Sequence, residues 1–279
     1  MIPYPLANFK KTTTLIGVGT RMEELTIPDW CTFVSIMLAG SGGNGGSGRS
    51  GAAGTSRGGG GGGSSAELIT AILPVIPGFI KNLYFYLPTS NDSGNAYVAV
   101  RPDASQSYRL LEAAKGGSGA TSTGSTGGAG GTGTAAAQSG MYQHLRVHNS
   151  VSGSVGAAGG AANVNGFTAT GGNRILSHGP GGAGITSTVR DGGSFNGWVG
   201  FPSVIGGVSS GPGNNGFYNF DSTPNMYTLA GSGGSSINSG TGGRGGNGAP
   251  GSGAGGGAAG STGGAGGTGG PSFAIVMMG

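Results

Sequence analysis

The chain has little of what most globular, membrane-spanning and nucleic-acid-binding proteins display. Only 8% of its residues are charged, and the 13 basic and 9 acidic residues are scattered, so no basic run can follow a phosphate backbone. No apolar run reaches the roughly 18 residues of a membrane span, and residues 1–6 lack the pattern of a secretory signal. We therefore expect a protein that is made in a cytosol, does not insert into membranes and does not bind nucleic acid.

Cysteine, proline and helical periodicity are also scarce. The single Cys31 cannot form an internal disulfide, and we expect it to be a small buried hydrophobe. The 13 prolines are too few for collagen, which needs about 15–20% proline or hydroxyproline. No window without glycine repeats apolar residues at helical spacing, so essentially no α-helix is expected.

Glycine, in contrast, is abundant, with 70 of 279 residues against an average usage near 7%. Because glycine loses the most backbone entropy on folding, such a chain is either disordered or adopts a structure that only glycine allows. Disordered chains are usually rich in charge and poor in aromatics. The low charge and the 35% hydrophobic content favour an ordered structure.

The glycines recur every third residue in two long tracts. The first contains Gly42, Gly45, Gly48, Gly51, Gly54, Gly60 and Gly63, interrupted at Arg57; the second contains Gly242, Gly245, Gly248, Gly251, Gly257, Gly260, Gly263, Gly266 and Gly269, interrupted at Ala254. A polyproline-II helix has three residues per turn and no internal hydrogen bonds, so its N–H and C=O groups must bond to neighbours. Glycine on a face lets backbones approach closely enough, and the spacing predicts a bundle of polyglycine-II helices.

Segments with the composition of strands flank these tracts. We expect strands within 25–38, 68–80, 82–87, 96–101, 108–111 and 272–278. The last of these could pair with 33–38. The predicted fold is mainly β and irregular, with a small β-rich N-terminal region and a polyglycine-II sandwich with long connecting loops.

Strings that resemble catalytic motifs occur here by chance, because glycine is so common. Residues 207–211 match a nucleophile elbow and residues 40–45 a dinucleotide fingerprint, but neither lies between a strand and a helix. Most carboxylates fall in or beside the β-rich region, and only Asp191 and Asp221 lie in the loops. His144 and His148 are four residues apart and His178 is distant, which is weak evidence for metal binding. We predict no enzyme, cofactor or metal site, while metal binding by loop histidines stays open.

Aromatic and basic residues interrupt the glycine tracts in positions typical of loops. Such side chains on a rigid scaffold are common in recognition surfaces. The candidate contact residues are Tyr142, His144, Arg146, Phe167, Arg174, Phe195, Trp198, Phe201, Phe217, Tyr218 and Tyr227. The alternative is that some of these residues form a small core that caps the helices.

The order of these segments resembles the glycine-rich tail-protein domain of phages. The similarity lies in Leu25-Thr26-Ile27-Pro28, in the apolar strand that runs into Ala39-Gly40-Ser41-Gly42-Gly43, in 68–79 and 110–117, and in Gly266-Gly267-Thr268-Gly269-Gly270 before the last strand. The larger architecture is similar to the tail-fibre-tip adhesins of T-even-like phages. This resemblance covers 25–279 and implies a virion tail protein that binds a bacterial surface receptor, either an outer-membrane protein or a polysaccharide.

The resulting hypothesis divides the chain into three parts. Residues 1–115, including a first glycine rod at about 40–64, attach to a phage fibre or baseplate protein. Residues 116–270 form the polyglycine-II bundle with receptor-binding loops, and 271–279 form a closing strand. A homotrimer is possible on this hypothesis. The alternatives are a purely structural tail component and an ice-binding glycine-rich protein.

Overall fold

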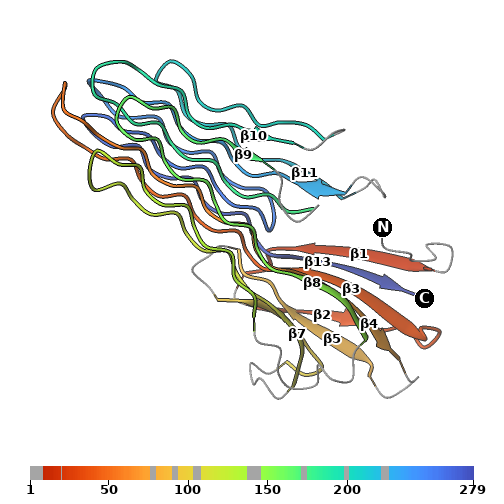
Figure 1. The fold of residues 1–279 in the computed structure, drawn as a ribbon. Coiled ribbons are helices and arrows are strands. Elements are labelled where there is room, and N and C mark those ends of the chain that lie inside the picture. The colour runs from red at the N-terminus through yellow and green to blue at the C-terminus, as the bar shows by residue number, and fades with distance from the viewer. Residues whose placement is uncertain are drawn as a thin grey trace.

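The computed structural model describes residues 9–19, 21–75, 80–89, 94–102, 108–136, 146–170, 175–197, 201–220 and 226–279. Strands and long irregular segments make up these residues, and none of them is in an α-helix. The prediction of a mainly β and irregular fold is therefore confirmed. Figure 1 shows the strands gathered at one end and the wavy, extended segments side by side at the other.

The strands form two larger sheets and two short pairs. The strands are β1 (Lys11–Ile16), β2 (Met22–Thr26), β3 (Phe33–Ala39), β4 (Leu68–Pro74), β5 (Asn82–Tyr86), β6 (Ala96–Ala99), β7 (Arg109–Ala113), β8 (Arg146–Val151), β9 (Ala169–Thr170), β10 (Phe195–Asn196), β11 (Tyr218–Asn219), β12 (Tyr227–Thr228) and β13 (Phe273–Met278). The 5-stranded sheet has the order β1-β13-β3-β4-β8, and the 4-stranded sheet has the order β2-β5-β6-β7. As predicted, the C-terminal strand β13 pairs with β3, with Ile275 opposite Met37.

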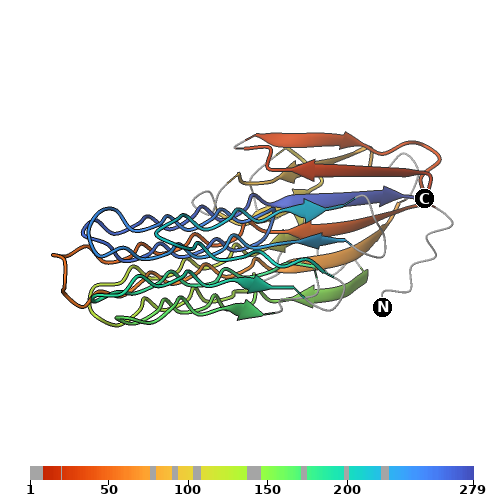
Figure 2. The same ribbon diagram turned by 90° about the horizontal axis from the view of Figure 1, so that it is seen from above.

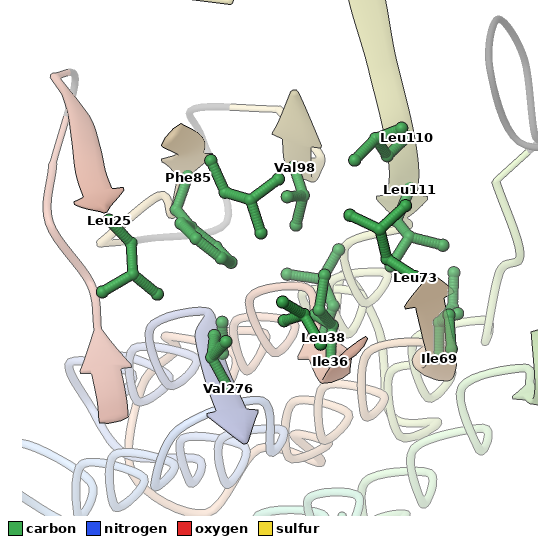
Figure 3. Close-up of a cluster of buried hydrophobic side chains, with 14 of the residues drawn as sticks. Leu25, Ile36, Leu38, Ile69, Leu73, Phe85, Val98, Leu110, Leu111 and Val276 are labelled. Carbon is green, nitrogen blue, oxygen red and sulfur yellow. The ribbon is translucent and has the colours of Figure 1, made fainter. Parts of the chain in front are cut away.

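The two larger sheets, which together are called the sandwich below, enclose a conventional hydrophobic core (Figure 3). Ile36 and Leu38 of β3 and Val276 of β13 point into it from one sheet, and Phe85 and Val98 enter from the other. Cys31 is buried in this core, as predicted, and burial raises the pKa of its thiol. Because successive strand residues point to opposite faces, residues in this register form one continuous apolar layer.

The second face of the 5-stranded sheet is buried as well. Met37, Phe273 and Ile275 point away from the sandwich core and pack with Leu176, while Phe220 packs against them from a loop. A strand buried on both faces needs apolar residues at nearly every position, which is why the residues of β3 and β13 do not alternate with polar ones.

The glycine segments continue the strands, and their backbone hydrogen bonds recur every third residue. In segment 41–49, which follows β3, Gly42, Gly45 and Gly48 donate to the carbonyls of Gly270, Gly267 and Gly264 at 2.8–2.9 Å. The next residue of each triplet donates to segment 58–64, and the preceding residue accepts from segment 116–122. A three-residue repeat directs successive peptide groups to different neighbouring segments, so one segment can bond to three or more neighbours. A β-strand, in contrast, hydrogen-bonds to at most two neighbouring strands.

Segment 58–66 shows the most complete case, because it lies between six other segments. The N–H groups of Gly58 to Gly63 donate in order to the carbonyls of Gly124, Gly160, Gly257, Ala120, Ala157 and Ala254. The carbonyls of Gly58 to Gly63 accept in order from Arg49, Gly128, Gly182, Gly46, Gly131 and Gly179. Every backbone polar group of these six buried residues is therefore satisfied by another segment.

Together the segments form a layered body, called the glycine slab below (Figure 2). One outer layer holds 116–122, 41–49 and 263–270; the next holds 127–134, 58–66, 252–260 and 242–249; the third holds 153–160, 179–185, 230–237 and 211–217; the other outer layer holds 164–168, 191–195 and 204–208. The order β13-β3-β4-β8 in the sheet is also the order of the segments attached to these strands, so the sheet leads directly into the slab.

Two expectations about the glycine tracts need correction. The predicted single rod at 40–64 is two antiparallel segments, because Arg49 donates to Gly58 and Gly43 donates to Ser64 across a turn at 50–57. The tract at 242–269 is likewise three segments, with turns near Pro250 and Ser261. Glycines such as Gly51 and Gly251 thus keep the triplet spacing within turns, because a turn of suitable length keeps the register.

The boundary expected at residue 115 does not coincide with a structural division. Segments 41–49 and 58–66 hydrogen-bond with 116–122 inside the slab, and β8 returns to the sheet beside β4. The sandwich and the slab are each assembled from several separate parts of the chain.

Candidate recognition surface

The slab has two ends with different side chains. At the end far from the sheets, the turns contain mostly Ser, Thr, Asn, Ala and Gly, at 50–56, 122–126, 161–163, 186–188, 209–210, 238–241 and 261–262. Toward the sheet end, the described residues include the aromatic side chains of Phe201, Phe217, Tyr218, Phe220 and Tyr227; Figure 1 labels β11 there. The aromatic loops therefore lie beside the sandwich and not at the far tip.

The far end is held together by one buried cation. The Arg57 guanidinium, which is not exposed at all, donates to the carbonyls of Gly51, Thr55 and Asn238 and to the Asn238 Oδ1 at 2.9–3.1 Å. Burial lowers its pKa. Because these partners come from two different turns, Arg57 joins them, and its position at the end of a segment explains the interruption of the glycine spacing.

Three of the predicted contact residues are exposed: Phe217 and Tyr218 at the sheet end, and Phe167 beside Gly181 in an outer layer of the slab. Phe167 is 54% exposed, Phe217 42% and Tyr218 49%. Phe201 and Tyr227 are half-buried near Phe217. The Tyr227 ring packs edge to face against the rings of Phe201 and Phe217, and its centroid is 5.5 Å from the first and 6.1 Å from the second. The structure thus brings Phe201, Phe217 and Tyr227 together from three positions in the sequence.

The inclusion of Phe195 among the contact residues is wrong. Its side chain is completely buried and packs with Val204, Leu229 and Ala230 between segments of the slab. Phe195 lies in the short strand β10, and its backbone bonds to Val204 in both directions at 2.9 Å. No local pattern indicated this burial, because Phe195 is flanked by polar residues and glycine as the exposed aromatic residues are.

The other predicted contacts are only partly covered by the structure. Tyr142, His144, Arg174 and Trp198 lie outside the described residues, and of Arg146 only the backbone, which pairs with Ile72 at the start of β8, is described. Phe220, which was not predicted as a contact, packs in tilted geometry against Tyr218 and Phe273, with ring centroids 4.9 and 4.7 Å away. One part of the loop at 217–220 therefore caps the sheet, while another part faces solvent.

An open pocket lies beside the exposed aromatics. Its volume is about 440 Å³, and it is lined by Ile16, Gly216, Phe217, Tyr218, Gly248, Ala249, Pro250 and Pro271. The lining comes from the end of β1, the start of β11 with the two residues before it, the turn at 248–250, and Pro271, which lies two residues before β13. No local sequence pattern could have predicted this convergence.

Ionisable groups do not form a metal centre in the part of the chain that the structure describes. No group of three His, Cys, Asp or Glu side chains there could hold a metal ion. His178, expected on an exposed loop, is half-buried, and burial lowers its pKa. The catalytic-looking string at 207–211 forms a far-end turn in which Ser209 and Ser210 have positive φ.

Glu67 lies at the junction between the sheet and the slab. It is 1% exposed, and its carboxylate accepts from the backbone of Ala114 and Ala136 and from the Ser150 hydroxyl at 2.6–2.9 Å. These three donors come from separate segments. Glu67 therefore links three segments of the chain at the junction.

Comparison with known proteins gives no assignment. No family model matches the chain, and no curated protein matches it. Within the described residues, no helix is long and apolar enough to cross a membrane.

Proposed function

We propose that this protein is a non-enzymatic bacteriophage tail-fibre or tail-tip adhesin that binds a bacterial surface receptor through loops displayed on a glycine scaffold. The observation that carries the proposal is the pair of exposed aromatic side chains, Phe217 and Tyr218, at one end of a hydrogen-bonded slab, with a third exposed ring, Phe167, on an outer layer of the same slab. Rigid aromatic side chains on a preorganised support lose little entropy on binding. The order of strands and glycine tracts, which resembles phage tail proteins, supports the same proposal.

The proposal includes the conformation of the glycine segments as polyglycine-II helices. Three residues per turn is the repeat of that helix, and the hydrogen bonds of 41–49 and 58–66 recur at the same interval. A helix of three residues per turn points its N–H groups in three directions and its C=O groups in three others. One segment can therefore bond to six neighbours, as 58–66 does.

On this proposal the sandwich attaches the protein to the virion. Its partner is a phage fibre or baseplate protein, and a homotrimer on a trimeric fibre is one possible assembly. The sandwich suits this role because its core is separate from the aromatic loops, so attachment at one end leaves Phe167 and Tyr218 accessible.

Competition of phage adsorption tests the proposal. Purified protein should block adsorption of the phage to its host cells, and the double variant F217A/Y218A should block it much less. The matched control is Trp30→Ala, because Trp30 is 41% exposed but lies on the sandwich, with the Lys10 Nζ 5.0 Å from its ring. Wild-type protein that neither binds cells nor competes would favour a purely structural tail component.

A second candidate function, ice binding, is favoured by one specific observation. Segments 124–133 and 260–269 have the identical sequence GSTGGAGGTG. In both, the alanine and threonine three residues apart are exposed: Ala129 and Thr132 in one, Ala265 and Thr268 in the other. Regular small side chains on a rigid support could match a water lattice. Thermal hysteresis of the purified protein would favour this function, and its absence would exclude it.

A further inference from the structure

The pocket beside Phe217 and Tyr218 has the properties of a preformed small-ligand site. Its volume of about 440 Å³ lies within the range of roughly 300–1,000 Å³ that is typical of ligand pockets. It is too small and too local for a helix or a strand, and it is large enough for one or two sugar rings.

Backbone hydrogen bonds fix the walls of this pocket. Gly216 donates to the carbonyl of Asn247 at 2.8 Å, and Gly248 donates to that of Thr268 at 2.9 Å. Gly251 donates to the carbonyl of Pro271 at 2.7 Å, which holds the proline wall against the neighbouring turn. A ligand that enters a site of this kind orders few protein groups, and so little binding free energy is lost.

The chemistry of the lining selects against charged ligands. Among the described residues that form the pocket, none has a carboxylate, an ammonium or a guanidinium group. A phosphate or a carboxylate would therefore lose hydration without gaining an opposite charge. The lining offers two aromatic rings, two prolines, Ile16, the Tyr218 hydroxyl and backbone polar groups.

The exposure of the rings selects against a wholly apolar ligand. Phe217 and Tyr218 keep 42% and 49% of their surface in water, so a ligand resting on them would also have one side in water. A sugar ring suits this position, because its apolar C–H face can lie on an aromatic ring while its hydroxyls reach the solvent and the Tyr218 hydroxyl.

We infer that this pocket binds an uncharged saccharide unit of a bacterial surface polysaccharide. The inference rests on the proposed adhesin function, which it makes more specific by naming the receptor chemistry. Phe217 and Tyr218 supply the stacking surfaces, and the prolines and Ile16 form the sides.

The test uses the full chain and an immobilised panel of neutral oligosaccharides built from glucose, galactose, rhamnose and N-acetylglucosamine. At least one member should bind the wild type, and F217A and Y218A should each raise the Kd about tenfold or more. Y218F, which keeps the ring, should retain most of the affinity. The matched control is F167A, since Phe167 is a comparably exposed aromatic residue on the slab that does not line the pocket.

Two outcomes would overturn the inference. One is that no neutral oligosaccharide in the panel binds the wild type; the other is that F217A and Y218A bind as well as F167A does. Amide NMR spectra of the variants show whether the loop keeps its structure. If Y218A does not fold, Y218F serves as the folded variant at this position.

The same proteins separate this inference from the proposed function. If the protein blocks phage adsorption but binds only a purified outer-membrane protein, the saccharide inference fails and the adhesin function stands. If the oligosaccharides bind in the pocket but the protein does not attach to cells, the adhesin function fails and the pocket assignment stands.

Discussion

The sandwich and the glycine slab are two solutions to the same problem of filling an interior. In the sandwich, side chains such as Leu38 and Phe85 exclude water, and backbone groups bond within flat sheets. In segment 58–66 of the slab there is almost no side chain to bury, and the backbone itself fills the space. The comparison shows that close packing and satisfied hydrogen bonds, not apolar side chains as such, define an interior.

The two regions should therefore respond oppositely to a change in side-chain size. The sandwich core should be damaged when a side chain is removed, because a cavity remains. The slab should be damaged when one is added, because backbone atoms occupy the space. At each of Gly58 to Gly63, an added Cβ would lie within 2.1 Å of a backbone carbonyl oxygen.

The largest effect is expected for Gly60→Ala in the centre of the slab. The new Cβ would lie 2.0 Å from the Gly46 oxygen, so two segments must separate and lose their hydrogen bonds. The free energy of unfolding, measured with denaturant, should fall by more than about 4 kcal/mol, or the protein should not fold. Gly124→Ala is the matched control, because its nearest atoms are 3.8 Å away. Equal stability of the two variants would contradict the account of the slab.

The next largest effect is expected for Phe85→Ala in the sandwich. Phe85 is completely buried in the core, and its removal should lower the free energy of unfolding by about 3–5 kcal/mol. Tyr84→Ala, a neighbouring half-buried position on the same strand, should have a clearly smaller effect in the same denaturation measurement. A loss below about 1 kcal/mol for Phe85→Ala would show that the sandwich does not depend on side-chain packing.

A smaller effect is expected for Glu67→Ala at the junction of the two regions. Three donors would lose their acceptor, of which the Ala114 amide is buried and the other two are partly buried, and a buried group left unsatisfied costs about 1–3 kcal/mol. We expect thermal unfolding to report a loss of about 2–3 kcal/mol, with partial relief by water. The exposed Glu23→Ala serves as the control. A neutral result at Glu67 would mean that the two regions are joined by the continuous strands alone.

The smallest effect on stability is expected for Tyr218→Ala. Half of this side chain is exposed, and the change should alter the free energy of unfolding by less than about 1 kcal/mol. Attachment to host cells should nevertheless fall, which surface binding of the labelled protein measures. A variant that is both stable and fully adhesive would remove Tyr218 from the recognition surface.

The sequence predicted the class of fold and six of the nine strands in the two larger sheets, for identifiable reasons. The apolar composition of β3, β4 and β13 indicated buried strands, and pairing of β13 with β3 followed from their similar length and character. The strands β1, β2 and β8 were missed. Lysine and threonines in β1, two glutamates in β2 and polar residues in β8 do not resemble a buried strand. Their place at the edges of the two sheets explains that composition.

The arrangement of the slab was not predictable from triplet spacing alone. The spacing continued through the turns at 50–57 and near Pro250, so it could not show where a segment ended. The run of six glycines, Gly58 to Gly63, does indicate a segment that is enclosed by others. A segment enclosed on all sides has no free face, whereas 127–134 exposes Ala129 and Thr132 where it meets solvent.

The candidate site was predictable only as a set of residues. The aromatic residues between the glycine tracts were visible in the sequence, but their fates differ: Phe217 is exposed, and Phe195 is buried. The pocket joins Ile16 to Pro271, and such long-range contacts depend on sheet order, which no local pattern reveals.

Amide hydrogen exchange is the most direct test of the claim that backbone hydrogen bonds form the interior of the slab. The amides of Gly58 to Gly63 should exchange as slowly as those of β3, although these residues have no side chains to bury, and the Ser125 amide in a far-end turn should exchange much faster. Exchange of the six glycine amides at the rate of an unstructured peptide would contradict the account.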